Sequence, residues 1–196
     1  MNYTLIGTKT TRSFRVLWAL EELGLTYTHL PERPHSDTVR GHNLPGKVPV
    51  FLVDDVALTD STAILHYLAD KHGGITYPAG TLDRARQDGM THFVLDELDA
   101  VLWTAARHSF ILPEDKRVPA VKDSLRWEFS RSVDELMRRK GDAPFVAGDR
   151  FTVADIIATH CANWALSARF PSDNPAFAAY CKQMRSRDAF GRAKAA

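Results

Sequence analysis

The sequence predicts an α/β domain followed by an all-helical domain, and two observations lead to this prediction. Strand and helix patterns alternate over the first 72 residues, whereas only helical periodicity follows residue 82. Between them, the segment GGITYPAGTL at residues 73–82 contains three glycines and one proline, which interrupt regular structure. We therefore expect one domain over residues 1–74 and a second over residues 83–196.

The elements of the first half are predicted from the spacing of apolar residues and from the positions of turn residues. Val16, Leu17 and Leu20 recur on one helical face ahead of Gly24, a typical helix-ending residue. Asp54-Asp55 separates two strand patterns as a hairpin turn. The expected elements are strands over 3–6, 26–30, 50–53 and 56–58, helices over 13–23 and 61–71, and a weak helix or turn over 36–42.

The second half shows helical period alone. Helices are expected over residues 82–110, 119–139, 152–168 and 175–185. Thr152 and Asp155 form a capping-box pattern at the start of the third, and Phe151 can pack on Ile156 as a hydrophobic staple. We interpret this signal as structural nucleation.

Composition excludes several classes of partner. The chain has 25 Lys and Arg against 24 Asp and Glu, so no single-sign field favours nucleic acid or an anionic membrane. No run of about 18 apolar residues suggests a membrane span, and we expect a cytoplasmic protein. Cys161 and Cys181 form no CxxC pair, which predicts reduced cysteines in helices of the core.

Common catalytic and cofactor motifs are missing from the sequence. The eight histidines show no recognised metal-ligand spacing, and neither GxGxxG nor GxxxxGK[ST] occurs. A GxSxG elbow is also absent. We therefore expect no metal, no nucleotide and no serine-hydrolase chemistry.

Two features point to a small peptide ligand with a free carboxylate. Pro49 opens a strand and cannot donate to a ladder, and X-Pro bonds adopt cis most easily, so the Val48 backbone is available to an extended peptide. Asp60-Ser61 lies at a helix start, where free amide groups favour a carboxylate or phosphate.

Three ordered segments resemble the cytosolic glutathione S-transferase family, in its bacterial type, over essentially the whole chain. They are GKVPV with the Asp60-Ser61 helix start, GDRFTVADI at 148–156 and RSRDAFGRA at 185–193. The resemblance implies a thioredoxin-like N-terminal domain that binds glutathione as co-substrate, and a helical domain that contributes a pocket for the electrophile. It also implies a homodimer.

The resemblance assigns glutathione-binding roles to five residues. Val48 resembles the position whose backbone pairs with the cysteinyl moiety, with Pro49 as the cis proline, and Lys47 resembles the residue that meets the glycyl carboxylate. Ser61 and Asp60 resemble the pair that holds the γ-glutamyl end, Ser61 at the carboxylate and Asp60 toward the ammonium. Simple helix capping by Asp60 or Ser61 and a solvated turn lysine at Lys47 remain alternatives.

In this family, the group that stabilises the glutathione thiolate lies between the first strand and the first helix. Here that loop, GTKTTRSFRVLW, contains four hydroxyl residues but neither Tyr nor Cys, which excludes the classes that use them. Related bacterial sequences resemble this loop with a Ser that falls on Thr11, our first choice. Thr10 and Ser13 remain open, and Ser13 is the expected helix cap.

Other residues are assigned by position. Arg12 and Arg15 could add positive potential near the sulfur, although a solvent-facing position is the favoured interpretation. Trp103, Arg107 and Phe110 fall where the family has its second-substrate pocket, and Arg107 would suit an electrophile with a carboxylate or nitro group; core packing is the alternative for the aromatics.

The expected function is a glutathione transferase of the detoxification type that acts on a small apolar electrophile. Glutathione-dependent isomerase, dehalogenase and peroxidase activities are neighbouring alternatives. A non-catalytic binding or interaction module is the rival from another class, favoured by the order NLPG in place of the family's commoner NPxG.

Overall fold

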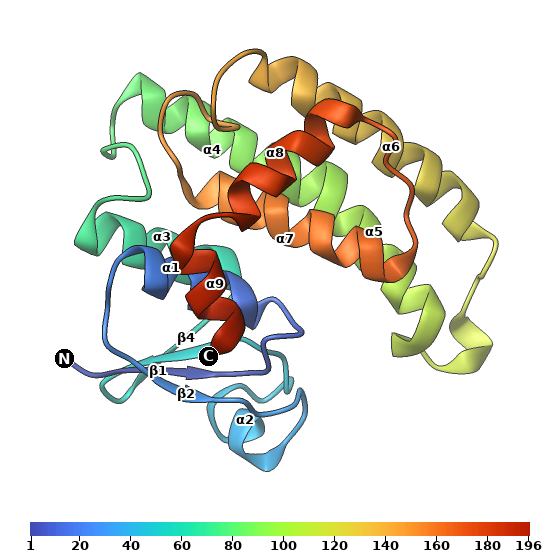
Figure 1. Cartoon of the computed structure of the whole chain (residues 1–196). Coiled ribbons are helices and arrows are strands. Elements are labelled where there is room, and N and C mark those ends of the chain that lie inside the picture. The colour runs from blue at the N-terminus through green and yellow to red at the C-terminus, as the bar shows by residue number, and fades with distance from the viewer. The chain divides into compact units, whose positions relative to one another are not determined.

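The computed structural model describes residues 1–196 and separates into two compact units, residues 1–81 with 185–196 and residues 82–184 (Figure 1). The predicted fold class is confirmed: a thioredoxin-like α/β unit precedes a helical one. The expected boundaries differ in one segment, because residues 185–196 join the first unit.

The first unit is built on a four-stranded mixed sheet. Its strands are β1 (Tyr3–Ile6), β2 (Thr28–Leu30), β3 (Val50–Val53) and β4 (Val56–Thr59). They lie in the order β2-β1-β3-β4, with β1 parallel to β2 and β3 antiparallel to both of its neighbours. Both outer strands are short, which limits the exposed backbone at the sheet edges.

Helices cover both faces of this sheet. Helices α1 (Ser13–Glu22) and α3 (Ser61–His72) lie on one face, and the short α2 (Asp37–His42) lies on the other (Figure 1). Val39 of α2 packs with Ile6 and Val50 in a fully buried cluster. Because successive strand residues point to opposite faces, the neighbouring buried residues Leu5 and Phe51 belong to the face of α1 and α3.

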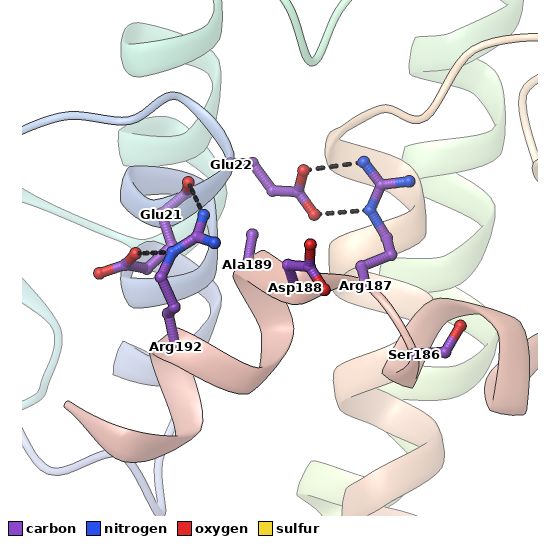
Figure 2. Close-up of a pocket in the computed structure, with 7 residues that line it drawn as sticks. All are labelled: Glu21, Glu22, Ser186, Arg187, Asp188, Ala189 and Arg192. Carbon is purple, nitrogen blue, oxygen red and sulfur yellow. Dashed lines mark hydrogen bonds and ion pairs between the residues drawn. The ribbon is translucent and has the colours of Figure 1, made fainter.

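The last helix, α9 (Asp188–Ala195), explains the change in domain boundary. Phe190 packs edge-on against Phe14 and Trp18 of α1, with ring centroids 5.3 and 5.0 Å apart. Arg187 Nε and Nη2 donate to the Glu22 carboxylate at 2.6 and 2.8 Å, and Arg192 Nε donates to Glu21 at 2.7 Å (Figure 2). The sequence pattern did not reveal this helix.

The second unit contains helices only. Its helical elements are α4 (Leu82–Val94), α5 (Ala100–Ala106), α6 (Val121–Lys140), α7 (Val153–Ala168) and α8 (Pro175–Arg185). The long helix expected over 82–110 forms, but two π-helical turns, Leu95–Asp99 and Arg107–Ile111, interrupt its regular hydrogen bonding. A 3-10 turn, Glu114–Lys116, precedes α6. No helix of the chain is long and apolar enough to cross a bilayer.

The start of α7 carries the predicted capping box. Asp155 Oδ2 accepts from the Thr152 amide at 2.8 Å, while Oδ1 accepts from the Val146 amide at 2.9 Å and the Tyr180 hydroxyl at 2.8 Å. Asp155 is fully buried, and this burial raises the pKa of its carboxyl to about 6 against the opposing effect of the donors. Cys161 and Cys181 are buried in helices and form no disulfide, as predicted.

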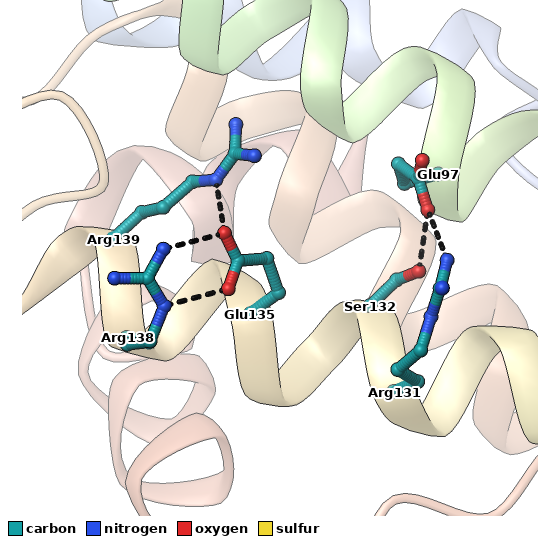
Figure 3. A network of polar contacts seen from close by, with 6 residues as sticks. All are labelled: Glu97, Arg131, Ser132, Glu135, Arg138 and Arg139. Carbon is teal, nitrogen blue, oxygen red and sulfur yellow. Dashed lines mark hydrogen bonds and ion pairs between the residues drawn. The ribbon is translucent and has the colours of Figure 1, made fainter.

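Helix α6 carries two groups of polar contacts, and the bond from Ser132 to Glu97 is part-buried whereas the bonds to Glu135 are exposed. Glu97 accepts from Ser132 Oγ at 2.7 Å and from Arg131 Nη2 at 3.3 Å, which links α6 to the first π turn (Figure 3). About one helical turn after Ser132, Glu135 accepts hydrogen bonds from Arg138 and Arg139, and these bonds lower the pKa of the Glu135 carboxyl to about 2.

Candidate ligand-binding site

The loop after β1 begins at a glycine that no other residue could replace without a shift. Gly7 has a φ of 142°, a conformation that L side chains rarely adopt. A Cβ atom there would overlap Ser13 Oγ and lie 3.0 Å from Val48 Cβ. The loop, the start of α1 and the approach to β3 therefore meet at Gly7, and Ser13 is fully buried behind it.

The loop hydroxyls differ in what they contact. Thr11 Oγ1 is part-buried, lies 2.7 Å from the Thr8 carbonyl oxygen and 3.0 Å from Ser13 Oγ, and accepts from the Ser13 amide at 3.2 Å. Thr10 is exposed, with its hydroxyl 3.2 Å from that of Thr8. Ser13 is the first residue of α1 and does not cap it; the hydroxyl that satisfies an amide at this helix start belongs to Thr11.

The segment before β3 has the features expected from its sequence. The Val48–Pro49 bond is cis, Pro49 is buried, Val48 is half-buried and the Lys47 side chain is exposed. Asn43 Nδ2 donates to the Lys47 carbonyl at 2.8 Å. Asn43 was not among the predicted site residues; its signal in the sequence is its place at the start of NLPG, where a side-chain amide can fix a turn.

Asp60 caps α3 from an unusual backbone conformation. Its Oδ1 accepts from the amides of Thr62 and Ala63 at 2.9 and 3.0 Å. Its φ of 70° with ψ of 121° lies outside the left-handed helical region that Asp tolerates, at a cost of about 1–3 kcal/mol. Both cap bonds use Oδ1, so the cap leaves Oδ2 of this exposed carboxylate available.

Arg15 brings positive charge to the start of α3, next to Ser61. Ser61 is 3% exposed, and its hydroxyl lies 3.4 Å from Arg15 Nη1. Arg15 is 1% exposed, so the solvent-facing interpretation of this arginine is wrong. The physical reason is that Arg15 lies on the side of α1 that packs on α3, where its Nη1 reaches the Ser61 hydroxyl. A buried cation beside helix amides favours an anionic ligand.

The predicted second-substrate residues lie on the end of the α4–α5 stretch in the second unit. Trp103 is half-buried, and Arg107, one turn later, is exposed and donates from Nη2 to Thr104 Oγ1 at 2.9 Å. Phe110 is 67% exposed in the second π turn. The positions Trp103 and Arg107 are neighbours on a helix surface.

The chain matches known proteins in both comparisons of sequence. Residues 11–71 match the family model for the glutathione S-transferase N-terminal domain. Glutathione S-transferase theta-2 of Rattus norvegicus is 32% identical over 57% of this chain and 48% of its own length. A probable glutathione S-transferase of Nicotiana tabacum is 28% identical over 78% of this chain and 66% of its own length.

A further relative is named as an elongation factor and not as a glutathione S-transferase. Elongation factor 1-gamma of Trypanosoma cruzi is 27% identical over 61% of this chain. The matched part is 28% of that protein, and among the first curated relatives the match spans about half of their length or less.

Solved structures with the same fold extend along the whole chain. A glutathione transferase of Phanerochaete chrysosporium, solved with oxidized glutathione, has a TM-score of 0.83 at 22% identity and covers 98% of this chain and 93% of its own. The theta class enzyme of Xanthomonas axonopodis pv. citri, solved with glutathione bound, has a TM-score of 0.81 at 22% identity and covers 97% and 96%. These likenesses establish the fold. The family model over residues 11–71 and the curated relatives show that part of the chain is similar in sequence to glutathione S-transferases.

Proposed function

We propose that this protein is a glutathione transferase, with residues 1–74 as its glutathione-binding domain and the helical residues after 83 as the source of its electrophile pocket. The observation that carries the proposal is the convergence at Gly7: the hydroxyl loop, the buried start of α1 and Val48 meet there. Arg15, on α1, in turn contacts Ser61 at the start of α3. The first unit therefore contains a loop with hydroxyl groups, the segment that leads into β3 and a helix start that favours anions.

Glutathione would bind along Val48 with its γ-glutamyl end at the start of α3. The amide of Ser61 and the charge of Arg15 favour the γ-glutamyl carboxylate, and Asp60 Oδ2 is available for the ammonium group. The exposed Lys47 can reach the glycyl carboxylate. Pro49 follows Val48 and lacks an amide proton, which leaves that part of the strand approach open to a peptide backbone.

Activation of the thiol requires a donor that stabilises the thiolate. A cysteine-type thiol has a pKa near about 8.5, and each 1.4 kcal/mol or so of preferential stabilisation lowers it by one unit. Thr11 is the first choice, because its hydroxyl can exchange its bond to the Thr8 carbonyl for one to the sulfur. Thr10 is exposed and ready to donate, whereas Ser13 would need Gly7 to move before it could reach a ligand.

The thiolate would then attack an electrophilic carbon. A carbon–sulfur bond forms, the electron pair of the broken bond leaves with the departing group, and the proton released on thiolate formation goes to solvent. Trp103 and Phe110 offer apolar surface, and Arg107 offers a cation for a carboxylate or nitro substituent. We propose a homodimer in the cytoplasm as the working form. Glutathione-dependent isomerase, dehalogenase and peroxidase activities are the alternatives to the transferase that would use the same thiolate.

A non-catalytic interaction module is the second candidate, and two observations favour it. The likeness to elongation factor 1-gamma extends over 61% of the chain. Within the loop, Thr11 already has hydrogen-bond partners and Ser13 is buried. Such a protein would hold glutathione or a protein partner without activating a thiol.

A titration of bound glutathione separates these functions. The protein is first tested for retention on immobilised glutathione, and the ultraviolet absorbance of the bound thiolate is then followed between about pH 5 and 9, a range that brackets the expected shift. A bound thiol pKa well below that of free glutathione supports the transferase, and conjugation of a generic aromatic halide tests it directly. Binding with an unshifted thiol pKa supports the module, and absence of binding contradicts both glutathione-dependent functions.

A further inference from the structure

The carbonyl group of Gly7 has a side-chain partner on the neighbouring strand. His29 Nε2 lies 2.9 Å from the Gly7 carbonyl oxygen. Because a carbonyl oxygen only accepts, the imidazole must carry a proton on Nε2 and donate it. The Gly7 amide donates to the Leu30 carbonyl at 2.9 Å. Both peptide groups of Gly7 are therefore held by β2.

The position of His29 on the sheet fits this contact. His29 pairs with Leu5 in the parallel ladder, so the two side chains share the face opposite the cluster of Ile6 and Val39. Its neighbours Thr28 and Leu30 are exposed, whereas His29 is half-buried. The ladder of β1 with β2 ends at the pair Ile6 and Leu30. Through its bond to the Gly7 carbonyl, His29 therefore connects β2 to the first residue of the loop, one position beyond the last pair of the ladder.

Gly7 is mechanically connected to the loop hydroxyls. Ser13 Oγ packs so closely on Gly7 that no Cβ fits between them, and Thr11 Oγ1 lies 3.0 Å from Ser13 Oγ. Thr11 in turn is bonded to the Thr8 carbonyl. Protein interiors are close-packed and transmit displacement, so a shift of Gly7 would move Ser13 and Thr11 together.

We propose that His29 is a positioning residue for the hydroxyl loop, residues 8–13. Its Nε2 proton fixes the Gly7 carbonyl, and this fixes the place of the Thr11 and Thr10 hydroxyls relative to Val48. The consequence for thiol activation depends on the proposed function, whereas the consequence for the loop itself does not.

Three variants of the full chain test the proposal. His29→Leu removes the donor, and His29→Gln keeps a donor at about the reach of Nε2. His42→Leu, at an exposed histidine of α2, is the matched control. Backbone amide hydrogen exchange of residues 8–13 is measured in the free protein, and the bound thiol pKa, kcat and KM for glutathione are measured where the wild type shows activity.

We expect faster amide exchange confined to the loop in His29→Leu, and wild-type exchange in His29→Gln and His42→Leu. With an active wild type, kcat falls about tenfold or more in His29→Leu while KM for glutathione changes little, because misplacement of a catalytic group by about 1 Å costs up to a hundredfold. Unchanged loop exchange in a folded His29→Leu overturns the proposal, as does a failure of His29→Gln to restore the loop. Faster loop exchange with an unshifted wild-type thiol pKa supports the role of His29 and rejects the transferase.

Discussion

Thr11 Oγ1 lies 3.0 Å from Ser13 Oγ and 2.7 Å from the Thr8 carbonyl oxygen, so it is hydrogen-bonded within its own loop. A Thr hydroxyl has one proton to donate and can accept from two partners. Stabilisation of a thiolate by Thr11 therefore requires the proton to turn from Thr8 to the sulfur, while the bond from the Ser13 amide can persist. The loop can stay folded during this exchange.

Replacement of Thr11 by valine is expected to reduce turnover and leave glutathione binding in place. Loss of one donor to a charged group is worth about 1.5–3 kcal/mol, which corresponds to a fall in kcat of about 10- to 150-fold. Steady-state kinetics with an aromatic halide, together with the bound thiol pKa, provide the measurement. Thr10→Val is the matched control, and a larger loss in Thr10→Val than in Thr11→Val would transfer the role to Thr10.

Ser61→Ala is expected to weaken glutathione binding. The change removes the hydroxyl that accompanies the Arg15 guanidinium at the start of α3 and leaves a buried donor with one fewer acceptor. A loss of about 1–2 kcal/mol, or roughly 5- to 30-fold in Kd, follows from these magnitudes. Isothermal titration with glutathione measures it. Thr62→Ala, one residue along the same helix start, should bind as the wild type does; equal losses in both variants would argue for a general effect on α3.

The pair of Arg187 and Glu22 is expected to contribute more stability than the pair of Arg138 and Glu135. Glu22 is 9% exposed and also accepts from Trp18 Nε1 at 2.9 Å, so its bonds to Arg187 are shielded from water (Figure 2). Arg187→Gln should lower the free energy of unfolding by about 1–2 kcal/mol. Denaturant unfolding measures the change.

The control for this comparison is Arg138→Gln on α6. Arg138 is 73% exposed, and pairs in that setting contribute little because water and salt screen them (Figure 3). We expect no measurable loss there, and an effect of Arg187→Gln that high salt changes little, because a shielded pair is screened less than an exposed one. Equal losses at the two sites would contradict the structural role assigned to the docking of α9.

Asp155 is expected to make stability depend on pH in an unusual direction. Burial raises the pKa of its carboxyl from 3.8 to about 6, so the folded state holds this proton more tightly than the unfolded state. The associated stability is fully present below the unfolded pKa and is lost as pH rises through the folded pKa. At 1.36 kcal/mol per unit, two units or so give a loss on the order of 3 kcal/mol between about pH 4 and pH 6.

The Asp155→Asn variant checks this assignment, because it removes the titration while keeping an oxygen that accepts hydrogen bonds. The free energy of unfolding is measured by denaturant titration at several pH values between about 4 and 7. The wild type should lose stability with rising pH relative to Asp155→Asn. Asp149→Asn, at an exposed position of the preceding loop, should follow the wild type. Parallel curves for all three proteins would assign the pH dependence to other groups.

The sequence predicted elements whose signals are local. The capping box of Thr152 and Asp155 fixes the start of α7 through contacts three residues apart, and the hairpin of β3 and β4 follows from Asp54-Asp55 between two strand patterns. Helix α9 was missed because it is eight residues long and owes its place to Phe190, whose partners on α1 lie over 170 residues earlier. The spacing of apolar residues within a short segment does not reveal a contact between such distant residues.

In the candidate site, too, the sequence predicted features that depend on nearby residues and missed those that depend on distant contacts. The sequence placed Asp60-Ser61 at a helix start and left capping by either residue open, and the structure shows Asp60 bonded to the amides of Thr62 and Ala63. The burial of Arg15 depends on which face of α1 packs against a distant segment. The bond from His29 to the Gly7 carbonyl depends in the same way on the pairing of β2 with β1. Asn43 lies between these cases, because the order NLPG was visible while the bond to the Lys47 carbonyl was not.

Gly7→Ala provides a final test, because the chain offers a second glycine that isolates the backbone contribution. Gly24 has a φ of 62°, and a Cβ atom added there would meet nothing within 4 Å, so Gly24→Ala incurs only the backbone cost of about 1–2 kcal/mol. Gly7→Ala adds a clash with Ser13 Oγ and a contact of 3.0 Å with Val48 Cβ. We expect a larger loss of unfolding free energy for Gly7→Ala in denaturant titrations, together with a raised pKa of the bound glutathione thiol, because relief of the clash must move Ser13 and hence Thr11. If Gly7→Ala lost no more stability than Gly24→Ala, the packing at Gly7 would be too loose to position the hydroxyls, and both the convergence at Gly7 and the role of His29 would lose their mechanical basis.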